Sequence, residues 1–297
     1  MTAQLARIRT AVLAWYADEH RDFPWRGSTD PFSVLVSEVM LQQTHASRVA
    51  ERFPRFMRRF PTAQALAAAS DSDVLAAWSG LGYNRRAIAL HGAARAIARD
   101  GWPADVVGLA RLPGVGPYTA RAIASLAFNR PVGVVDTNVR RWLLRRFGGP
   151  DERARLQALA DALANPGRGA EVAAWTHASM ELGAAVCRAR DPRCDACPVA
   201  VGCPSRHAPA RVELPRQPGL RGSDRAYRGA LLKRLSAAHG HRLAEAAARM
   251  ELAEASDGIG PTLDDAGWER ILAGLERDGL AHRRRGDLLL GAATIAR

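Results

Sequence analysis

The sequence predicts an all-α protein that ends in a small α+β unit. Apolar residues recur at helical spacing along most of the chain, whereas alternating, strand-like runs are scarce. The 297 residues are enough for two or three domains. Pro, Arg and Gly concentrate at 206–221, so we expect a linker there and a separate C-terminal unit at 222–297.

Helix boundaries follow from caps and breakers as well as from apolar spacing. Asp30 and Pro31 open a helix through FSVLVSEVMLQQT, because Asp caps a helix and Pro suits its first position. A helix also follows Pro117, and Asp136 opens NVRRWLLRRF after the short apolar stretch PVGVV. The other helices before the linker are expected at 3–19, 46–59, 62–69, 71–79, 84–99, 104–111, 152–164 and 170–186.

The C-terminal unit combines helices with a short hairpin. Helices are expected near 224–237, 241–252 and 263–279. The last segment, HRRRGDLLLGAA, has the pattern of a strand, a Gly turn and a second strand. Three helices and a hairpin resemble a winged helix, whose basic turn at 283–285 would contact phosphate. A solvated basic turn is the alternative.

Composition and charge narrow the class of protein. Hydrophobic residues make up 47% and charged residues 24%, which excludes a mostly disordered or collagen-like chain. Lys and Arg number 42 against 30 Asp and Glu, a net charge of +12. A net charge this positive indicates that the protein binds nucleic acid, or, as a second choice, an anionic membrane surface.

No targeting or membrane segment is expected. The sequence has no run of about 18 apolar residues, so it predicts no transmembrane helix. Residues 1–23 contain three acids and no long apolar run, which indicates an amphipathic helix and not a signal peptide. We therefore expect a cytoplasmic, nucleoid-associated monomer.

Four cysteines lie together in one loop. They are Cys187, Cys194, Cys197 and Cys203, with intervals of six, two and five residues. They are too few for a disulfide framework in a chain of this length, and thiolates in one loop are typical of a metal site. They suit either Zn(II) or a [4Fe–4S] cluster. The first interval also carries Arg188, Arg190 and Arg193, which either contact phosphate or form a solvated basic loop.

The segment LPGVGPYT, at 112–119, has the pattern of a helix-hairpin-helix turn. Gly114 and Gly116 permit a tight turn around Val115, and Pro117 begins the next helix. Free N–H groups at such a turn can bind a phosphate oxygen without reading the base sequence. An ordinary turn between helices is the alternative.

Two carboxylates stand out by their surroundings. Glu38 lies inside the apolar stretch VLVSEVML, where desolvation should raise its pKa and suit it to donate a proton. Asp136 lies at a helix N-terminus, which favours the ionised form. An acid and an anion of this kind are what cleavage of a glycosidic bond needs. The alternatives are a solvated helix carboxylate and a simple N-cap.

Five motifs together indicate a known family. They are SEVMLQQT (37–44), GLGYNRRA (80–87), LPGVGPYTA (112–120), VVDTNVRR (134–141) and the cysteine loop, in that order. Over residues 3–205 the chain resembles the MutY family of adenine DNA glycosylases, in the endonuclease III superfamily. The resemblance implies a six-helix barrel at 29–133, an iron–sulfur lobe formed by 1–28 and 134–205, and double-stranded DNA bound between them. It also implies that the cysteines hold a [4Fe–4S] cluster.

The resemblance further implies a reaction. Adenine opposite 8-oxoguanine or guanine would be flipped out of the duplex and excised. Glu38 would protonate adenine N7 and Asp136 would stabilise the sugar cation, with support from Tyr118 and Asn138. The residues implied to contact the bases are Trp25, Arg26 and Leu41 in the adenine pocket, Gln43 and Tyr83 as wedges in the base stack, and His177 at a base edge.

Residue 118 separates two kinds of glycosylase. A bifunctional glycosylase-lyase attacks the sugar with an amine, and the lysine of that subclass would fall at Tyr118. The only lysine of this chain, Lys233, lies in the C-terminal unit. We therefore expect a monofunctional enzyme with little or no lyase activity.

The chain also departs from the family pattern. Thr137 replaces a common Gly, and His177 stands where Glu or Gln is frequent. The C-terminal unit is too short and too helical for the Nudix-like domain that senses 8-oxoguanine in the family. Two other functions stay open: a thymine or uracil mismatch glycosylase on the same scaffold, and a non-catalytic DNA-binding regulator. Glu38 argues against a thymine or uracil glycosylase, because it is a purine that benefits from a proton donor at N7. The presence of both carboxylates, Glu38 and Asp136, argues against a non-catalytic regulator.

Overall fold

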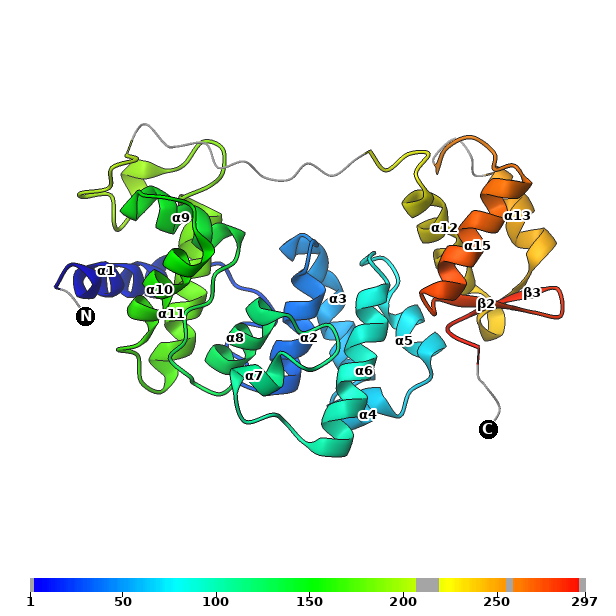
Figure 1. Ribbon diagram of the computed structural model, residues 1–297, viewed down its shortest axis with the longest axis horizontal. Coiled ribbons are helices and arrows are strands. Elements are labelled where there is room, and N and C mark those ends of the chain that lie inside the picture. The colour runs from blue at the N-terminus through cyan, green and yellow to red at the C-terminus, as the bar shows by residue number, and fades with distance from the viewer. Residues whose placement is uncertain (1–2, 207–218, 255–258, 294–297) are drawn as a thin grey trace. The chain divides into compact units, whose positions relative to one another are not determined.

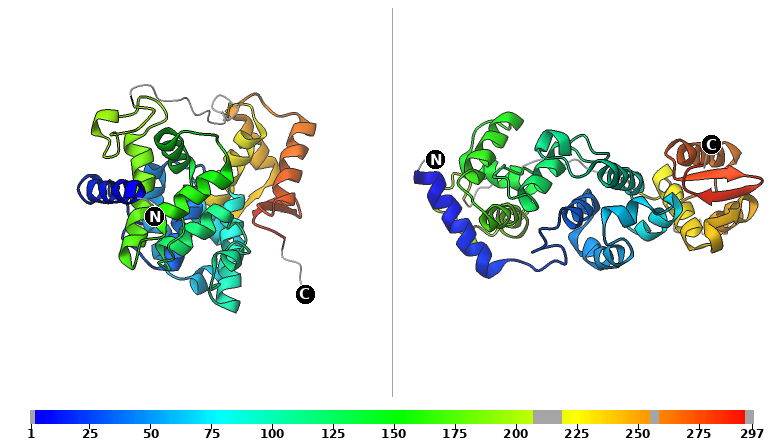
Figure 2. Two further views of the ribbon diagram at one scale, coloured as in Figure 1. Left: turned by 60° about the vertical axis from the view of Figure 1, so that its left-hand side comes forward. Right: turned by 90° about the horizontal axis from the view of Figure 1, so that it is seen from below.

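The computed structural model of the chain describes residues 3–206, 219–254 and 259–293 (Figures 1 and 2). Most of the linker expected at 206–221 lies outside these residues. The chain divides into two compact units, one drawn from 1–38, 102–111 and 115–215, the other from 39–101, 112–114 and 216–297. Helices dominate both, and a small sheet is present, which confirms the expected fold class. The lobe boundaries implied by the resemblance stay a prediction.

All the regular elements described in the first unit are helices or helical turns. Its elements are α1 (Ala3–Glu19), most of α2 (Pro31–Leu41), α7 (Val106–Leu109), α8 (Pro117–Leu126), α9 (Thr137–Phe147), α10 (Arg153–Ala164), α11 (Ala170–Glu181), a π-helical turn η1 (Leu182–Val186) and a 3-10 turn η2 (Cys194–Ala196). Helix α1 packs along α10 and α11 (Figure 1). Their shared core includes Val12, Trp142 and Leu163, all nearly inaccessible to solvent.

The π-helical turn replaces the last part of the helix expected at 170–186. Cys187 N donates to Leu182 O at 2.7 Å and closes the wider turn. Gly183 lies in this turn, against the backbone of α9. A Cβ on Gly183 would lie 2.5 Å from the carbonyl oxygen of Asn138, so only glycine fits. The turn thereby brings the start of the cysteine loop close to the first residues of α9.

The second unit begins with the helices that follow α2. They are α3 (Ala46–Arg59), α4 (Ala63–Ala67), α5 (Asp71–Trp78) and α6 (Arg85–Asp100). Helix α6 packs on both α4 and α5. The side chain of Trp78 is fully buried and meets Phe56 edge to face, with ring centroids 5.9 Å apart. This core supports the turn between α5 and α6, which carries Tyr83.

The C-terminal part of the second unit is α+β, as expected. Its described elements are α12 (Asp224–Ala237), a 3-10 turn η3 (His239–His241), β1 (Arg242–Ala244), α13 (Glu245–Glu254), α15 (Asp265–Arg277), β2 (Ala281–Arg284) and β3 (Asp287–Leu290). The strands form an antiparallel sheet in the order β1-β3-β2. Figure 2 shows the hairpin of β2 and β3.

The sequence interpretation was wrong at 242–244, which it placed in a helix. These residues form β1, because Leu243 pairs with Leu288 and completes the sheet. A strand of three residues has no detectable period, and its pairing with β3 is a long-range contact. The helix expected at 104–111 is also shorter, since α7 covers only Val106–Leu109. No helix among the described residues is long and apolar enough to cross a membrane.

Candidate active site

Glu38 is a buried acid on α2. Its residue is only 5% exposed, and the apolar residues around it on the helix are buried as well. Burial raises its pKa from 4.5 to about 7; a hydrogen bond from Tyr118 lowers it, and the nearby charge of Asp136 raises it. The expected desolvation of Glu38 is therefore present, and a large fraction of this carboxyl group holds its proton at neutral pH.

Tyr118 is the hydrogen-bond partner of Glu38. It lies in the first turn of α8, immediately after Pro117. Burial and the carboxylates of Glu38 and Asp136 raise the pKa of its phenol well above the ordinary value of 10. Tyr118 therefore keeps its proton and donates it in the hydrogen bond to Glu38. The structure thus brings together three residues that are 80 and 18 positions apart in sequence.

Asp136 is the N-cap of α9. Its Oδ1 accepts a hydrogen bond from Val139 N at 2.6 Å, and its Oδ2 accepts one from Asn138 Nδ2 at 2.8 Å. Burial raises its pKa, while these hydrogen bonds and the charge of Arg141 lower it. The helix N-terminus favours the anion as expected, but the net shift is upward because desolvation outweighs these contacts.

Arg141, which the sequence reading missed, links this site to the cysteine loop. Its Nη2 donates to Asn138 Oδ1 at 2.8 Å, and its Nε donates to the carbonyl of Cys187 at 2.7 Å. The first contact orients the Asn138 amide, so that its NH2 group faces Asp136. Arg141 lies one helical turn beyond Asn138, and this spacing was the available signal. A buried arginine, 4% exposed, cannot be recognised from sequence alone.

The four cysteines surround one small pocket. It is lined by Cys187, Cys194, Cys197 and Cys203, with Arg145, Val186, Pro192 and Ala200 among its other residues. Arg145 Nη1 lies 3.5 Å from Cys187 Sγ, where its charge would stabilise a thiolate. Within the described ranges, no three His, Cys, Asp or Glu side chains converge closely enough to hold a metal ion. Four cysteines that line one pocket are the soft donors that a metal centre uses.

The arginines of the cysteine loop differ in whether their side chains have an acidic partner. Arg188 bonds to the carbonyl and the carboxylate of Asp191, at 2.7 and 2.9 Å. Arg190 and Arg193 are exposed, and neither has an ion-pair partner within the part of the chain that the structure describes. These two remain available for an anionic partner.

Three of the residues implied to contact bases lie in the first unit. Trp25 is buried and stacks on Phe23, with ring centroids 4.8 Å apart. The guanidinium of Arg26 forms a close ion pair with Glu181, which is 1% exposed and was not singled out from the sequence. Burial and the charge of Arg26 lower the pKa of His177 to about 4, so its imidazole is neutral at pH 7 and can both donate and accept.

The other three lie in the second unit. Leu41 is the last residue of α2, and Gln43 follows it as an exposed residue with φ of 54°. Tyr83 is 37% exposed and has φ of 47°. Its hydroxyl accepts a hydrogen bond from Arg225 of the C-terminal part at 3.4 Å. Gln43 and Tyr83 therefore share an unusual, left-handed backbone conformation for residues that are not glycine.

The expected turn between two helices is present at 112–117. Gly114 has φ of 74°, and a Cβ there would lie only 2.7 Å from Cβ of Ala89, so glycine is required. Gly116 is the N-cap of α8, and Pro117 occupies the first helical position. Val115 is buried, whereas Gly114 and Gly116 are exposed, so the two glycines are accessible to a ligand.

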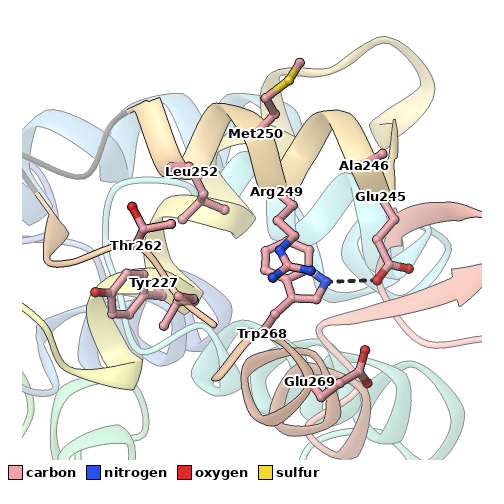
Figure 3. A pocket seen from close by; sticks show the side chains of 11 residues that line it. Tyr227, Glu245, Ala246, Arg249, Met250, Leu252, Thr262, Trp268 and Glu269 are labelled. Atoms are coloured by element: carbon pink, nitrogen blue, oxygen red, sulfur yellow. Dashed lines mark hydrogen bonds between the residues drawn. The ribbon is translucent and has the colours of Figure 1, made fainter. Parts of the chain in front are cut away.

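A larger pocket of about 620 Å³ lies in the C-terminal part and contains none of the candidate residues (Figure 3). It is bounded by α13 and α15, and Trp268 Nε1 donates to Glu245 across it at 2.9 Å. Arg283 of the basic turn is held nearby, at 3.4 Å from Glu245 and 2.7 Å from Glu269. Arg283 is therefore paired with two acids, which would compete with phosphate for its guanidinium.

Arg283→Ala should accordingly change stability more than DNA affinity. We expect a loss of about 1 kcal/mol or less, because the ion pairs are partly exposed. Thermal unfolding and titration with duplex DNA would test this. A large drop in affinity at an unchanged Tm would show instead that Arg283 contacts DNA.

Known DNA repair proteins are similar to this chain in sequence and in fold. Residues 36–166 match the HhH-GPD superfamily of base excision DNA repair proteins. An adenine DNA glycosylase of Mycobacterium tuberculosis (strain CDC 1551 / Oshkosh) is 47% identical over 239 residues, covering 77% of this chain and 78% of that protein. An adenine DNA glycosylase of Homo sapiens is 39% identical over 239 residues, covering 74% of this chain and 43% of that protein.

A solved structure of a thermostable thymine-DNA glycosylase also matches, with a TM-score of 0.63 and 28% identity. The match covers 69% of this chain and 97% of that one. The thymine-DNA glycosylase shares the helical scaffold, whereas the higher sequence identities are to adenine DNA glycosylases. The chain therefore belongs to the adenine DNA glycosylase family, within the HhH-GPD superfamily of base excision DNA repair proteins.

Proposed function

We propose that the protein is a monofunctional glycosylase that removes adenine mispaired with 8-oxoguanine or guanine in double-stranded DNA. The observation that carries the proposal is the buried Glu38, which has a pKa of about 7, a hydrogen bond from Tyr118 and Asp136 close by. A carboxylic acid that keeps its proton at neutral pH can donate it to a leaving base. A second carboxylate beside it can stabilise the sugar that the base leaves behind.

In the proposed reaction the bond between adenine N9 and the sugar C1′ breaks. Glu38 donates its proton to N7, so the electron pair of the broken bond leaves with a neutral base. Asp136, oriented by Asn138, stabilises the cation that forms at C1′. Water then adds to C1′, its proton returns to a carboxylate, and an abasic site remains. The only lysine, Lys233, is far from this site in sequence, so strand cleavage through an imine is not expected.

The remaining candidate residues would bind DNA. Trp25, Arg26, Leu41 and His177 would contact the flipped adenine, and Gln43 and Tyr83 would enter the base stack. Gly114, Val115 and Gly116, together with Arg188, Arg190 and Arg193, would contact the phosphate backbone. Arg188 would do so less readily, because it is held by Asp191.

The cysteine loop would hold a [4Fe–4S] cluster through Cys187, Cys194, Cys197 and Cys203. When bound, the cluster would hold the loop in a single conformation, and no chemical step passes through it. Because Arg141 bonds both to Cys187 O and to Asn138, an ordered loop would also help to keep the Asn138 amide directed at Asp136.

Replacing Cys203 by Ser should release the iron. The wild-type protein should contain about four iron and four acid-labile sulfide per chain, and Cys203→Ser far less of both. Elemental analysis of protein purified without oxygen would measure this. One zinc per chain in the wild type, with no sulfide, would contradict the cluster.

The rate of adenine release should fall as the pH rises through about 7. Glu38 must hold its proton to act as the acid, and its pKa is raised to about 7, so the active fraction is high below that pH and declines above it. Single-turnover rates between about pH 5.5 and 9 would show the descending limb. A rate that stays constant or rises between about pH 6 and 8 would contradict this role for Glu38.

Single-turnover cleavage of labelled duplexes tests the proposed function. The duplexes carry 8-oxoguanine:A, G:A, G:T and G:U pairs. Strand breaks are measured in each duplex with and without hot alkali. Adenine release that yields strand breaks only after alkali supports the proposal. Activity on G:T or G:U alone would favour thymine or uracil excision, the candidate favoured by the similarity to a thymine-DNA glycosylase structure.

A further inference from the structure

One side chain, that of Arg86, joins the two turns that carry Gln43 and Tyr83. Arg86 lies in the first turn of α6. Its Nη1 donates to the carbonyl oxygens of Val39 and Met40, both at 2.9 Å, and makes a closer contact with that of Gln42. These three carbonyls are at the end of α2, where a helix has no partners of its own for them. Arg86 therefore caps α2 directly before Gln43.

The other nitrogens of Arg86 reach the second turn. Nη2 donates to Gly82 O at 3.0 Å and to Leu81 O at 3.3 Å, directly before Tyr83. The same nitrogen donates to Thr44 Oγ1 at 3.0 Å, directly after Gln43. The four N–H groups on Nη1 and Nη2 of one guanidinium thus contact the residues on both sides of Gln43 and those that precede Tyr83.

Both turns need such support. Gln43 and Tyr83 have φ values of 54° and 47°, in the left-handed region that side chains other than glycine rarely adopt. Such conformations persist only where their surroundings hold them, and they occur often at functional sites. Arg86 also stacks over two rings, 5.3 Å from the centroid of Trp78 and 5.5 Å from that of Tyr83. Its contacts therefore constrain the aromatic side chain as well as the backbone.

The contacts of Arg86 require a guanidinium. Burial lowers the pKa of Arg86 to about 10, so it remains charged at neutral pH and its hydrogen bonds are charge-assisted. A lysine ammonium has three donors on one atom and cannot span two turns. Arg95 provides a contrast on the same helix. It is exposed, and among the residues that the structure describes it makes one ion pair, with Asp71 at 3.2 Å.

We propose that Arg86 is a positioning residue, which fixes the geometry of Gln43 and Tyr83 relative to each other so that both enter the base stack together. The proposal rests on the proposed function, in which these two residues act as wedges. Arg86 itself touches neither the base nor the sugar. Its loss should therefore impair the opening of the mispair and leave the chemistry at Glu38 and Asp136 unchanged.

Arg86→Lys, compared with the matched variant Arg95→Lys, tests the proposal. The probe is a duplex with 2-aminopurine beside the mispaired adenine, whose fluorescence rises when the stack opens. Measurements are made at a temperature where circular dichroism shows both variants fully folded. We expect Arg86→Lys to reduce the fluorescence rise and the single-turnover rate about tenfold or more, since small misplacements have such effects. Arg95→Lys should behave as wild type.

The pH–rate profile separates positioning from damage to the active site. In Arg86→Lys the rate of adenine release should be lower at every pH. The pH at which this rate begins to decline should be the same as in the wild type. Two results would overturn the proposal. One is a decline of the rate at a different pH, and the other is a fully folded Arg86→Lys variant that opens DNA to the same extent as the wild type. If wild type itself opens DNA but releases no adenine from any duplex, the proposed function fails separately.

Thr44→Val provides a second test if Arg86→Lys does not fold. Valine has the shape of threonine, so the change removes the acceptor for Arg86 Nη2 and, with the same hydroxyl, the weaker hydrogen bond that Thr44 donates to Gln42 O at 3.3 Å. We expect a smaller loss of opening, about two- to fivefold, in line with one hydrogen bond to a charged group. Wild-type opening in Thr44→Val would then overturn the proposal.

Discussion

Replacing Glu38 by Gln should reduce the rate of adenine release by about 10²- to 10⁴-fold, the usual contribution of a positioned general acid. Glutamine keeps the shape of the side chain and can still accept the hydrogen bond from Tyr118, but its amide has no acidic proton to transfer to the base. Single-turnover cleavage of an 8-oxoguanine:A duplex measures the rate. DNA binding should change little, because Glu38 is only 5% exposed and, in the proposed reaction, meets the base and not the phosphate backbone.

Thermal unfolding supplies the control for Glu38→Gln. The folded-state pKa of Glu38 is about 7 against an ordinary 4.5, so its protonated form favours folding and its ionised form opposes it. The stability that the protonated form supports is present below about pH 4.5 and is lost as the pH rises through about 7. The Tm of Glu38→Gln should therefore equal or exceed that of wild type, and the difference should grow at higher pH. A variant with normal stability and a wild-type rate would exclude Glu38 as the acid.

Replacing Asp136 by Asn should reduce the rate of adenine release by about 10²- to 10³-fold. This is the usual effect in enzymes of removing one group that stabilises a charge developing in the transition state. The change separates two roles of this residue. Asparagine is as good an N-cap as aspartate, so the amide can still accept from Val139 N and α9 should keep its start. What is lost is the negative charge that would face the sugar cation, together with the hydrogen bond from Asn138 Nδ2, because asparagine has an NH2 group in place of Oδ2.

Asp136→Ala completes this comparison. Alanine removes the cap as well as the charge, so it should lower the free energy of unfolding by about 1 kcal/mol, whereas Asp136→Asn should not. Chemical denaturation of the three proteins measures the difference. Wild-type activity in Asp136→Asn would reduce Asp136 to a helix cap, which is the other interpretation of its position.

Much of the fold could be predicted from local chemistry. Apolar spacing predicted most helices, and the caps at Asp30 and Asp136 were correct because a cap depends on a few neighbouring residues. The errors arose where contacts are not local. Residues 242–244 form a strand only because β3 pairs with them, and the helix expected to continue to 186 changes to a π-helical turn at Leu182.

The features of the candidate site also fall into two groups: those marked by local sequence and those that depend on contacts in space. By itself the sequence determined the family, the four cysteines, the acid in an apolar helix and the aspartate at a helix start, because each is marked by residue type and spacing. Only the tertiary structure decided which groups meet: the Tyr118 hydrogen bond to Glu38, the ion pair of Arg26 with Glu181, and the contacts of Arg86 with two turns. The physical reason is that hydrogen bonds and desolvation depend on distance in space: burial is the main cause that raises the pKa of Glu38 to about 7, and the nearby charge of Asp136 adds to it.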